Sequence, residues 1–332
     1  MTTILLSAPY MLSCLERFRP VFKYYNLDLI VPTVNERLSE AEILNYAGQF
    51  DGAVCGDDRY SKAVLEACLP RLKVISKWGT GIDSIDRQAA EGFGIRVCNT
   101  PNAFTMPVAD SVLGYILTFA RGLPWMDRFV KAGNWKKLPG RSLSECTLGV
   151  IGVGNVGKAV LRRARGFGMK LLGNDIVTIA PDFVLENGVE MTGLADLLQR
   201  ADFVSTNCDL NPSSYHIIRK DTLDWMKPEA VLVNTARGPL VAEQDLVAAL
   251  KSGRIAGAAL DVFEVEPLPA DSALRGMDNV LLAPHNSNSS PAAWERVHWN
   301  TIRNLLEGLG ISCEDLDERR HEVDNIHQGI DC

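Results

Sequence analysis

The segment Thr147–Asp175 reads TLGVIGVGNVGKAVLRRARGFGMKLLGND and determines how the rest of the chain is interpreted. An apolar run leads into the spacing Gly152-x-Gly154-x-x-Gly157, and a helix-like segment with apolar residues three or four positions apart follows. A second apolar run then ends at Asp175, 18 residues beyond Gly157. The order of strand, glycine-rich turn, helix, strand and acidic residue is typical of a dinucleotide-binding site.

The three glycines have different physical roles at such a site. Gly152 allows a tight turn, Gly154 lets a pyrophosphate approach the backbone, and Gly157 lets the helix lie close to the sheet. The amino-terminal end of the helix offers unpaired N–H groups and the positive end of its dipole to phosphates. A glycine turn with a purely structural role is the alternative, but the flanking strand, helix and acidic residue together favour cofactor binding.

The residue type at position 175 indicates which dinucleotide binds. A carboxylate accepts hydrogen bonds from the ribose hydroxyls of NAD and repels the additional phosphate of NADP. The next residues, Ile176, Val177 and Thr178, include no Arg or Lys to hold that phosphate. We therefore expect NAD as the cofactor.

Length and composition set the broad class. A chain of 332 residues suggests two domains, and a net charge of −7 gives no cationic surface for nucleic acid or an anionic membrane. The eight cysteines have no metal-type spacing, so we expect no metal site and reduced thiols in a cytoplasmic protein. No signal peptide is recognised at the amino terminus, and the longest apolar stretch, 107–122, is too short for a membrane span.

The first hundred residues alternate short apolar runs with helix-like segments, which predicts a parallel sheet covered by helices. The expected strands are Thr3–Ser7, Asp28–Val31, Gly52–Cys55, Lys73–Lys77 and Arg96–Cys98. The expected helices are Ser39–Gly48, Ser61–Cys68 and Ser84–Gly92, each opened by a serine that can cap it. Directly after the fourth strand, Trp78–Asp83 reads WGTGID, and its two glycines let the amides of Thr80, Gly81 and Ile82 cradle an anion. A plain turn between strand and helix is an equally good interpretation of that segment on turn chemistry alone.

A long apolar helix over Pro107–Gly122 is expected to connect to a second domain. The amphipathic segment Leu123–Ser144 is expected to be irregular, either an arm toward a partner subunit or a surface loop. Beyond Asp175 the alternation resumes and predicts a doubly wound sheet of six or seven strands. A last helix runs from Pro291 to about Gly308, and the charged tail from Ser312 is expected to have little fixed structure.

Three polar residues follow later strands of this sheet, at the edge where doubly wound sheets bind ligands. Arg237 follows Val231–Ala236, Glu266 follows the strand that ends in Asp261-Val262-Phe263, and His285 follows Val280–Pro284. An imidazole exchanges protons near neutral pH, a carboxylate fixes its tautomer, and a guanidinium binds a substrate carboxylate. Each residue alone could be a surface or turn residue, but together they suit hydride chemistry on a hydroxy or keto acid.

With these motifs the chain resembles the D-isomer-specific 2-hydroxyacid dehydrogenase family, which includes the D-3-phosphoglycerate dehydrogenases. The resemblance covers Thr3 to about Gly308 and rests on six motifs: GTGIDSID (79–86), NTP (99–101), GxGxxG with Asp175, NTARGPLV (234–241), ALDVFEVEPLP (259–269) and APH (283–285).

The family pattern implies a catalytic set of Arg237, which orients the substrate, His285 as acid/base and Glu266 as its partner. It implies cofactor contacts at Gly152, Gly154, Asn155, Val156, Gly157, Asp175, Cys208, Thr235 and Asp261. It also implies that Thr80 and Gly81 lie near the substrate carboxylate or the cofactor, and we expect them to bind the substrate. The implied fold is a Rossmann NAD-binding domain (101–285) inserted into a flavodoxin-like substrate domain (1–100 and 286–332), and the implied assembly is a homodimer.

Two departures from the family pattern concern the substrate. Asn286–Ser290 follows the APH motif, where many members have Leu-Gly-Ala, and this places polar side chains beside His285. Phosphoglycerate dehydrogenases tend to carry an Arg after the third strand, whereas Gly56-Asp57-Asp58 stands here, and only Arg59 or Lys77 could replace it.

The resulting hypothesis is an NAD-dependent enzyme that interconverts a D-2-hydroxy acid and its 2-keto acid. The alternatives are an NAD(H)-sensing scaffold without turnover, as in corepressors of this fold, and a phosphite dehydrogenase. Formate dehydrogenase is disfavoured because that branch has Gln at the position of Glu266.

Overall fold

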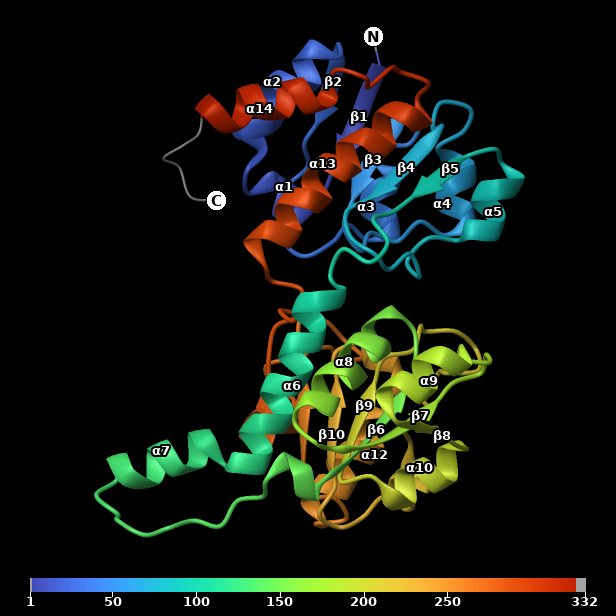
Figure 1. The fold of residues 1–332 in the computed structure, drawn as a ribbon. Coiled ribbons are helices and arrows are strands. Elements are labelled where there is room, and N and C mark those ends of the chain that lie inside the picture. The colour runs from blue at the N-terminus through green and yellow to red at the C-terminus, as the bar shows by residue number, and fades with distance from the viewer. Residues whose placement is uncertain (1, 327–332) are drawn as a thin grey trace. The chain divides into compact units, whose positions relative to one another are not determined.

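The computed structural model describes residues 2–326, which form two compact units. One unit contains the chain up to Phe104 and the chain from Ser290 onward, and the other contains Thr105–Ser289. Figure 1 shows the elements of both units with the labels used below.

The first unit is built on a five-stranded sheet in which every strand pairing is parallel. The strand order is β2-β1-β3-β4-β5, so the direction in which successive strands are added to the sheet reverses once, and the switch point lies between β1 and β3. This is the flavodoxin-like order. The strands are β1 (Thr2–Leu6), β2 (Leu27–Ile30), β3 (Gly52–Cys55), β4 (Val74–Lys77) and β5 (Arg96–Cys98).

Helices cover both faces of this sheet. Those of the first unit are α1 (Pro9–Leu12), α2 (Leu15–Tyr24), α3 (Glu40–Leu44), α4 (Lys62–Ala67), α5 (Arg87–Gly92), α13 (Pro291–Gly308) and α14 (Leu316–Ile326). One core contains Leu5 and Ile75 from the strands with Ile43 and Val64 from α3 and α4. On the other face α13 lies so close that a Cβ on its Gly308 would meet Val74 on β4.

The second unit has a seven-stranded sheet in the order β12-β11-β10-β9-β6-β7-β8, again with every pairing parallel. In chain order, β6, β7 and β8 are added toward one edge of the sheet, and β9, β10, β11 and β12 are added toward the other edge. This is the Rossmann order with one added strand. The strands are β6 (Thr147–Ile151), β7 (Lys170–Asn174), β8 (Val189–Met191), β9 (Phe203–Thr206), β10 (Val231–Asn234), β11 (Gly257–Leu260) and β12 (Val280–Leu282). The predicted fold class, two doubly wound parallel-sheet domains, is confirmed.

Successive residues of β10 point to opposite faces of the sheet, as a strand requires. Val231 and Val233 belong to a core shared with α6 and α8, whereas Leu232 belongs to a core shared with α10 and α12. The helices of this unit are α6 (Thr105–Arg121), α7 (Leu123–Lys131), α8 (Asn155–Gly166), α9 (Pro181–Asn187), α10 (Leu194–Arg200), α11 (Lys220–Leu223) and α12 (Glu243–Lys251). Three short 3-10 turns complete it: Leu143–Glu145, Gly238–Leu240 and Ala273–Gly276.

The prediction of an unstructured tail from Ser312 is wrong for the described residues, because α14 forms there. Asp315, just before this helix, accepts hydrogen bonds of 2.6 Å from the hydroxyls of both Tyr24 and Tyr25. Leu316 and Val323 are buried. Two apolar anchors and one carboxylate, together with the 2.8 Å ion pair between Arg303 and Asp317, thus dock a helix that composition alone marks as disordered. Residues 327–332 of the predicted tail lie outside the described residues.

The segment Leu123–Ser144, expected to be irregular, begins with the helix α7. No residue of α7 is buried, and in Figure 1 this helix and the chain after it extend away from the sheet of their unit. Leu123–Lys131 is amphipathic, which is the pattern of a helix with one apolar face, so the signal was present but the prediction of an irregular segment did not use it.

Two predicted serine caps also fail. Asp86, not Ser84, caps α5 by accepting a hydrogen bond from the N–H of Ala89, and Ser61 makes no side-chain cap bond. Ser39 does cap α3, in a capping box with Glu42.

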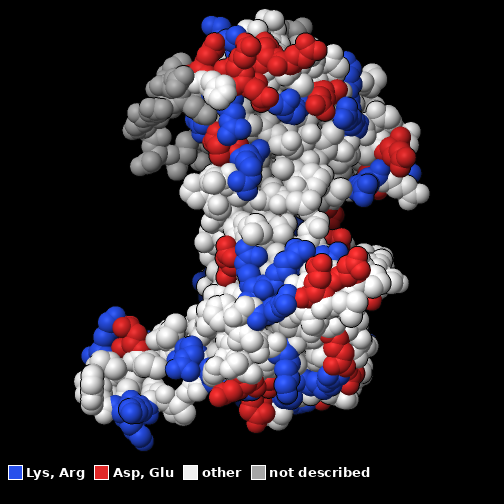
Figure 2. Space-filling model, viewed as in Figure 1, with Lys and Arg blue, Asp and Glu red and all other residues white. Residues whose placement is uncertain are grey.

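Among the described residues, none of the helices combines the length and the apolar character that crossing a bilayer demands. On the face shown in Figure 2, acidic and basic side chains are interleaved on both units.

Candidate active site

The predicted site residues of the second unit follow strands whose carboxyl ends lie in one row. Ile151 is in register with Asn174 on one side and with Thr206 on the other. The row continues from Thr206 through Asn234 and Leu260 to Leu282. In this unit, each residue that we expect to bind cofactor or substrate comes soon after one of these strand ends or lies in α8, the helix that follows β6. The register of the sheet therefore brings together residues that are separated by more than a hundred positions in sequence.

The glycine turn has the close packing that its sequence demands. Gly152 has a φ of +91°, and a Cβ there would lie 2.4 Å from the backbone nitrogen of Cys208. A Cβ on Gly157 would lie 2.1 Å from the carbonyl oxygen of Gly152, which is inside any allowed contact. Both positions therefore exclude a side chain, and they hold α8 and the end of β9 against the turn.

Gly154 differs from its two neighbours, because a Cβ there would meet nothing within 4 Å. This residue is exposed and is the N-cap of α8, where no side chain caps the helix. The N–H groups of the first turn, which begins with Asn155 and Val156, thus face an open surface that a pyrophosphate can occupy.

Asp175 is tied to the same turn. One carboxylate oxygen accepts a 2.6 Å hydrogen bond from the N–H of Val153, and the other accepts a 3.0 Å bond from the N–H of Val177. The carboxylate is therefore fixed at the end of β7, next to the glycine turn, as ribose recognition requires.

Two further positions in this row suit a bound dinucleotide. The buried hydroxyl oxygen of Thr235 has no hydrogen-bond partner within the described chain. Such an orphaned group calls for a ligand or a water. Burial raises the pKa of the Cys208 thiol to about 11, so it adds no negative charge beside a pyrophosphate. The residues present therefore fit NAD.

His285 is held by the end of the neighbouring strand. Its N–H donates a 2.8 Å hydrogen bond to the carbonyl oxygen of Asp261, and its φ of +52° lies in the left-handed region. The buried carboxylate of Asp261 accepts bonds of 2.7 and 2.9 Å from the N–H groups of Asn286 and Ser287. Asp261 thus organises the backbone on both sides of the His285 side chain, a positioning role that the sequence did not reveal.

Glu266 and His285 contact each other directly. The distance between Oε2 of Glu266 and Nδ1 of His285 is 3.0 Å, and both side chains are about one-third exposed. The other carboxylate oxygen of Glu266 accepts a 2.9 Å bond from the N–H of Phe263, which fixes the carboxylate at the end of β11. Because a carboxylate only accepts, the proton shared by this pair lies on Nδ1 and the exchangeable position is Nε2.

Arg237 lies in a tight turn at the end of β10. Its carbonyl oxygen accepts a 2.9 Å bond from the side chain of Asn234, and its guanidinium donates a 2.8 Å bond to the carbonyl of Ala236. A Cβ on the next residue, Gly238, would lie 1.9 Å from the carbonyl oxygen of Phe263, so only glycine fits. This contact packs the Arg237 turn against the segment that also carries Glu266.

Thr80 and Gly81 belong to the first unit, in the loop after β4. The hydroxyl of Thr80 donates a 2.9 Å bond to the carbonyl of Thr100, and the N–H of Thr100 donates a 2.8 Å bond to the carbonyl of Gly79. Gly79 has a φ of +115°. The loop is therefore a fixed structure, joined to the chain after β5.

The pairing of Asp57 with Lys77 was not predicted from the sequence. Nζ of Lys77 lies 3.1 Å from a carboxylate oxygen of Asp57 and donates a 3.0 Å bond to the carbonyl of Trp78. Lys77 is the last residue of β4 and Asp57 follows β3, its neighbour in the sheet. The sequence did offer one signal for this pair, because Lys77 is a charged residue at the end of a buried strand and needs a partner.

Comparisons with known proteins show the family of this chain. The family model described as "D-isomer specific 2-hydroxyacid dehydrogenase, NAD binding domain" matches residues 113–287. A glyoxylate reductase from Korarchaeum cryptofilum is 40% identical over 255 residues, covering 75% of this chain and 76% of the relative. A hydroxypyruvate reductase from Thermotoga maritima is 36% identical over 282 residues, covering 83% of this chain and 90% of the relative.

A solved structure of a D-lactate dehydrogenase from Aquifex aeolicus, complexed with NAD and lactic acid, superposes with a TM-score of 0.81. It is 26% identical and covers 99% of this chain and 100% of its own.

The chain therefore belongs to the D-isomer-specific 2-hydroxyacid dehydrogenase family. It is an NAD-dependent oxidoreductase that acts on D-2-hydroxy acids and 2-keto acids, so the predicted family, enzyme class and cofactor are confirmed.

Proposed function

We propose that this enzyme reduces a small, unphosphorylated 2-keto acid, with glyoxylate as the first candidate, and that His285, Glu266 and Arg237 perform the chemistry. The observation that carries the assignment is the 3.0 Å contact between Glu266 and His285. It lies in the same row of strand ends as the glycine turn.

In this proposal His285 moves the proton. Glu266 holds the Nδ1 proton, so that Nε2 of the imidazolium donates to the oxygen of the keto group as the hydroxyl forms. The carboxylate of Glu266 also stabilises the positive charge on the ring before that transfer. In the reverse direction, neutral His285 removes the hydroxyl proton through Nε2.

The nicotinamide cofactor, when bound, would supply a hydride to C2 of the keto acid as NADH or accept one from C2 of the hydroxy acid as NAD⁺. The chain would hold it with Gly152, Gly154, Asn155, Val156 and Gly157 at the pyrophosphate, with Asp175 at a ribose, and with Cys208, Thr235 and Asp261 along the same row. The family match supports the cofactor, and the open N-terminus of α8 and the orphaned hydroxyl of Thr235 support the residue assignments.

Arg237 binds the substrate carboxylate and polarises the neighbouring carbonyl. A guanidinium suits this task because it offers two parallel N–H groups to a planar carboxylate. In the first unit we keep Thr80 and Gly81 as substrate-binding residues, because the backbone amides of a glycine-rich turn can bind a carboxylate. The first unit thus acts as the substrate domain and the second as the NAD-binding domain.

The charges at the end of β3 disfavour a phosphorylated substrate. Asp57 and Asp58 stand where a phosphoglycerate dehydrogenase tends to have an Arg, and the charge of Lys77 is offset by Asp57 at 3.1 Å. A phosphate would bring two further negative charges to this acidic region. A substrate with a hydrogen or a hydroxymethyl group beside the keto carbon avoids that repulsion, and the relatives named above as reductases of glyoxylate and hydroxypyruvate are consistent with this choice.

A panel assay tests the proposal. Oxidation of NADH is followed with glyoxylate, hydroxypyruvate, pyruvate and 3-phosphohydroxypyruvate at equal concentrations. The proposal predicts a higher kcat/KM for the first two than for the phosphorylated compound. A preference for 3-phosphohydroxypyruvate would overturn the substrate assignment, and no oxidation with any 2-keto acid would overturn the proposed reaction.

The homodimer remains a proposal, supported by α7 and the chain after it. Leu123, Val130 and Trp135 are exposed apolar residues on this extension, and a second copy of the chain is the partner we infer. Sedimentation velocity on the whole chain distinguishes a dimer from a monomer. The cytoplasmic location stays a prediction, which fractionation of the source cells can check.

A further inference from the structure

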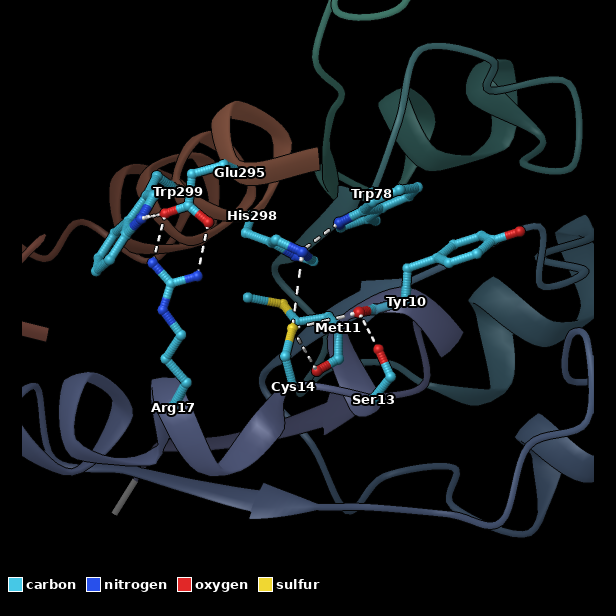
Figure 3. A network of polar contacts seen from close by, with 9 residues as sticks. All are labelled: Tyr10, Met11, Ser13, Cys14, Arg17, Trp78, Glu295, His298 and Trp299. Atoms are coloured by element: carbon cyan, nitrogen blue, oxygen red, sulfur yellow. Dashed lines mark hydrogen bonds and ion pairs between the residues drawn. The ribbon is translucent and has the colours of Figure 1, made fainter. Parts of the chain in front are cut away.

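His298 is a buried titratable residue of the first unit for which the proposed chemistry has no use. It lies on α13, the helix that begins six residues after His285 in the sequence, and only 4% of its surface is exposed. Its ring contacts two segments that are far away in the sequence. Nδ1 lies 3.0 Å from the indole nitrogen of Trp78, and Nε2 lies 3.7 Å from the sulfur of Cys14 (Figure 3).

The chemistry of these neighbours assigns the ring proton. The indole N–H of Trp78 can only donate, so Nδ1 must carry a lone pair and the neutral ring carries its proton on Nε2, toward Cys14. Burial lowers the pKa of His298 to about 4, which keeps the ring neutral in ordinary buffers.

The acidic side chain nearest to His298 in sequence on α13 is bonded to groups other than the His298 ring. Glu295, one turn earlier on α13, accepts two 2.7 Å bonds from Arg17 and a 2.6 Å bond from the indole of Trp299. Figure 3 shows its carboxylate directed toward those two side chains. The acceptor on His298 is therefore committed to Trp78.

Trp78 is the first residue of the loop that carries Thr80 and Gly81. Its ring stacks on Tyr10 with centroids 4.9 Å apart and packs on Phe104 and Trp294 at 5.6 and 6.3 Å. Its backbone N–H donates a 2.9 Å bond to the carbonyl of Cys55. The first residue of the glycine loop is therefore held twice, by its backbone bond to Cys55 and by the packing of its indole.

The same helix, α13, also holds the other end of the loop network. Asn300 donates a 2.9 Å bond to the hydroxyl of Thr100, and Asn304 donates a 2.9 Å bond to the carbonyl of Asn99. Thr100 in turn contacts Gly79 and Thr80. One helix thus anchors both segments that fix the loop, and His298 is its contact with the loop's first residue.

From this geometry we propose that His298 is a positioning residue, which acts through the indole of Trp78 to hold the Gly79–Gly81 amides where they bind the substrate carboxylate. The inference rests on the proposed function for the binding role of that loop. His298 touches neither the reacting atoms nor the cofactor-binding residues named above. Its loss therefore weakens substrate binding and leaves the chemical step nearly unchanged.

The test compares three variants of the whole chain in steady-state reduction of glyoxylate. His298→Phe keeps a ring but leaves the indole N–H unpaired, so KM is expected to rise on the order of tenfold with kcat little changed. His298→Asn keeps an acceptor near the Nδ1 position and is expected to restore most of the wild-type KM. Cys14→Ala removes the other contact of the ring and is expected to leave KM unchanged.

A double-mutant cycle shows whether the effect passes through Trp78. Trp78→Phe alone is expected to raise KM, and adding His298→Phe to it is expected to raise KM little further. Equal KM values in wild type and His298→Phe, or fully additive effects in the cycle, overturn the inference. If His298→Phe does not fold, Trp78→Phe and His298→Asn still test it, because an unchanged KM in Trp78→Phe contradicts the coupling.

Hydrogen exchange separates this inference from the proposed function. Peptides that contain residues 78–83 are expected to exchange faster in His298→Phe than in wild type and Cys14→Ala, whether or not the enzyme turns over glyoxylate. A wild-type protein without turnover contradicts the proposed function alone. Unchanged exchange in an active enzyme with an unchanged KM contradicts the positioning role alone.

Discussion

Oε2 of Glu266 lies 3.0 Å from Nδ1 of His285, and the two residues come from the ends of neighbouring parallel strands, β11 and β12. The first unit plays no part in this contact. A second pair of the same kind exists in the second unit, because Nε2 of His216 lies 2.6 Å from Oε1 of Glu264. His216 does not follow a strand end of the cofactor row, so the second pair provides a matched control for the first.

Replacing Glu266 with Gln is expected to lower kcat for glyoxylate reduction on the order of a hundredfold, because the amide cannot stabilise the imidazolium that donates the proton. Binding of NADH, followed by its fluorescence, is expected to change little. Glu264→Gln removes the carboxylate of the control pair and is expected to retain wild-type kcat. Equal losses in both variants would show that the contact at His285 has no special role.

Asp175 is expected to determine the preference for NADH over NADPH. Asp175→Ser removes the charge that repels the 2′-phosphate. It also removes the hydrogen bonds that the carboxylate accepts from Val153 in the glycine turn and from Val177. The KM for NADH is expected to rise about tenfold, and the kcat/KM ratio of NADPH to NADH is expected to rise with it. Asp182→Ser, an exposed acidic residue on α9, is the control and should leave that ratio unchanged.

The pair of Asp57 and Lys77 offers a test of substrate charge. Asp57→Ser removes the carboxylate that lies 3.1 Å from Nζ of Lys77, so the positive charge of Lys77 is no longer offset by it. The kcat/KM for 3-phosphohydroxypyruvate relative to hydroxypyruvate is expected to rise roughly tenfold. Glu91→Ser changes the net charge equally on α5, and a similar rise in that variant would contradict the assignment.

His298 also predicts how stability depends on pH. Its pKa is lowered to about 4 by burial, so the unfolded chain takes up its proton first as the pH falls below about 6.5. Stability is therefore complete above pH 6.5 and declines between 6.5 and 4, with about 2 kcal/mol lost by pH 5.

The neighbouring carboxylate of Glu295 has a pKa that burial alone would raise but that Arg17 and Trp299 hold below its usual range. Its contribution is lost only at lower pH, so urea unfolding between pH 7 and pH 5 separates the effect of His298 from that of Glu295. His298→Phe is expected to lack most of this decline, and an undiminished decline in that variant would assign the effect to other groups.

The fold could be predicted from the sequence because its signals are local. Buried parallel strands appear as short apolar runs, and Gly152, Gly154 and Gly157 mark the one turn that a dinucleotide approaches. The strand register then determines which later residues share an edge, so the contact between Glu266 and His285 follows from their positions after β11 and β12.

What could not be predicted depends on contacts between distant segments. The bond from Trp78 to His298 joins residues 220 positions apart, and neither residue type indicates it. Asp315 docks α14 through two tyrosines nearly three hundred residues earlier in the chain. The helix α2 contains Pro20, a residue that by itself predicts the end of a helix. The helix continues through it, and the buried side chains of Phe18, Val21 and Phe22 stabilise it.

The most direct test of the central claim compares His285→Ala with His216→Ala in NADH-dependent reduction of glyoxylate. Loss of the acid/base group is expected to lower kcat by about a thousandfold or more in His285→Ala, with NADH binding nearly intact. His216→Ala is expected to keep wild-type kcat. Turnover by His285→Ala within a few fold of the wild-type rate would contradict the account.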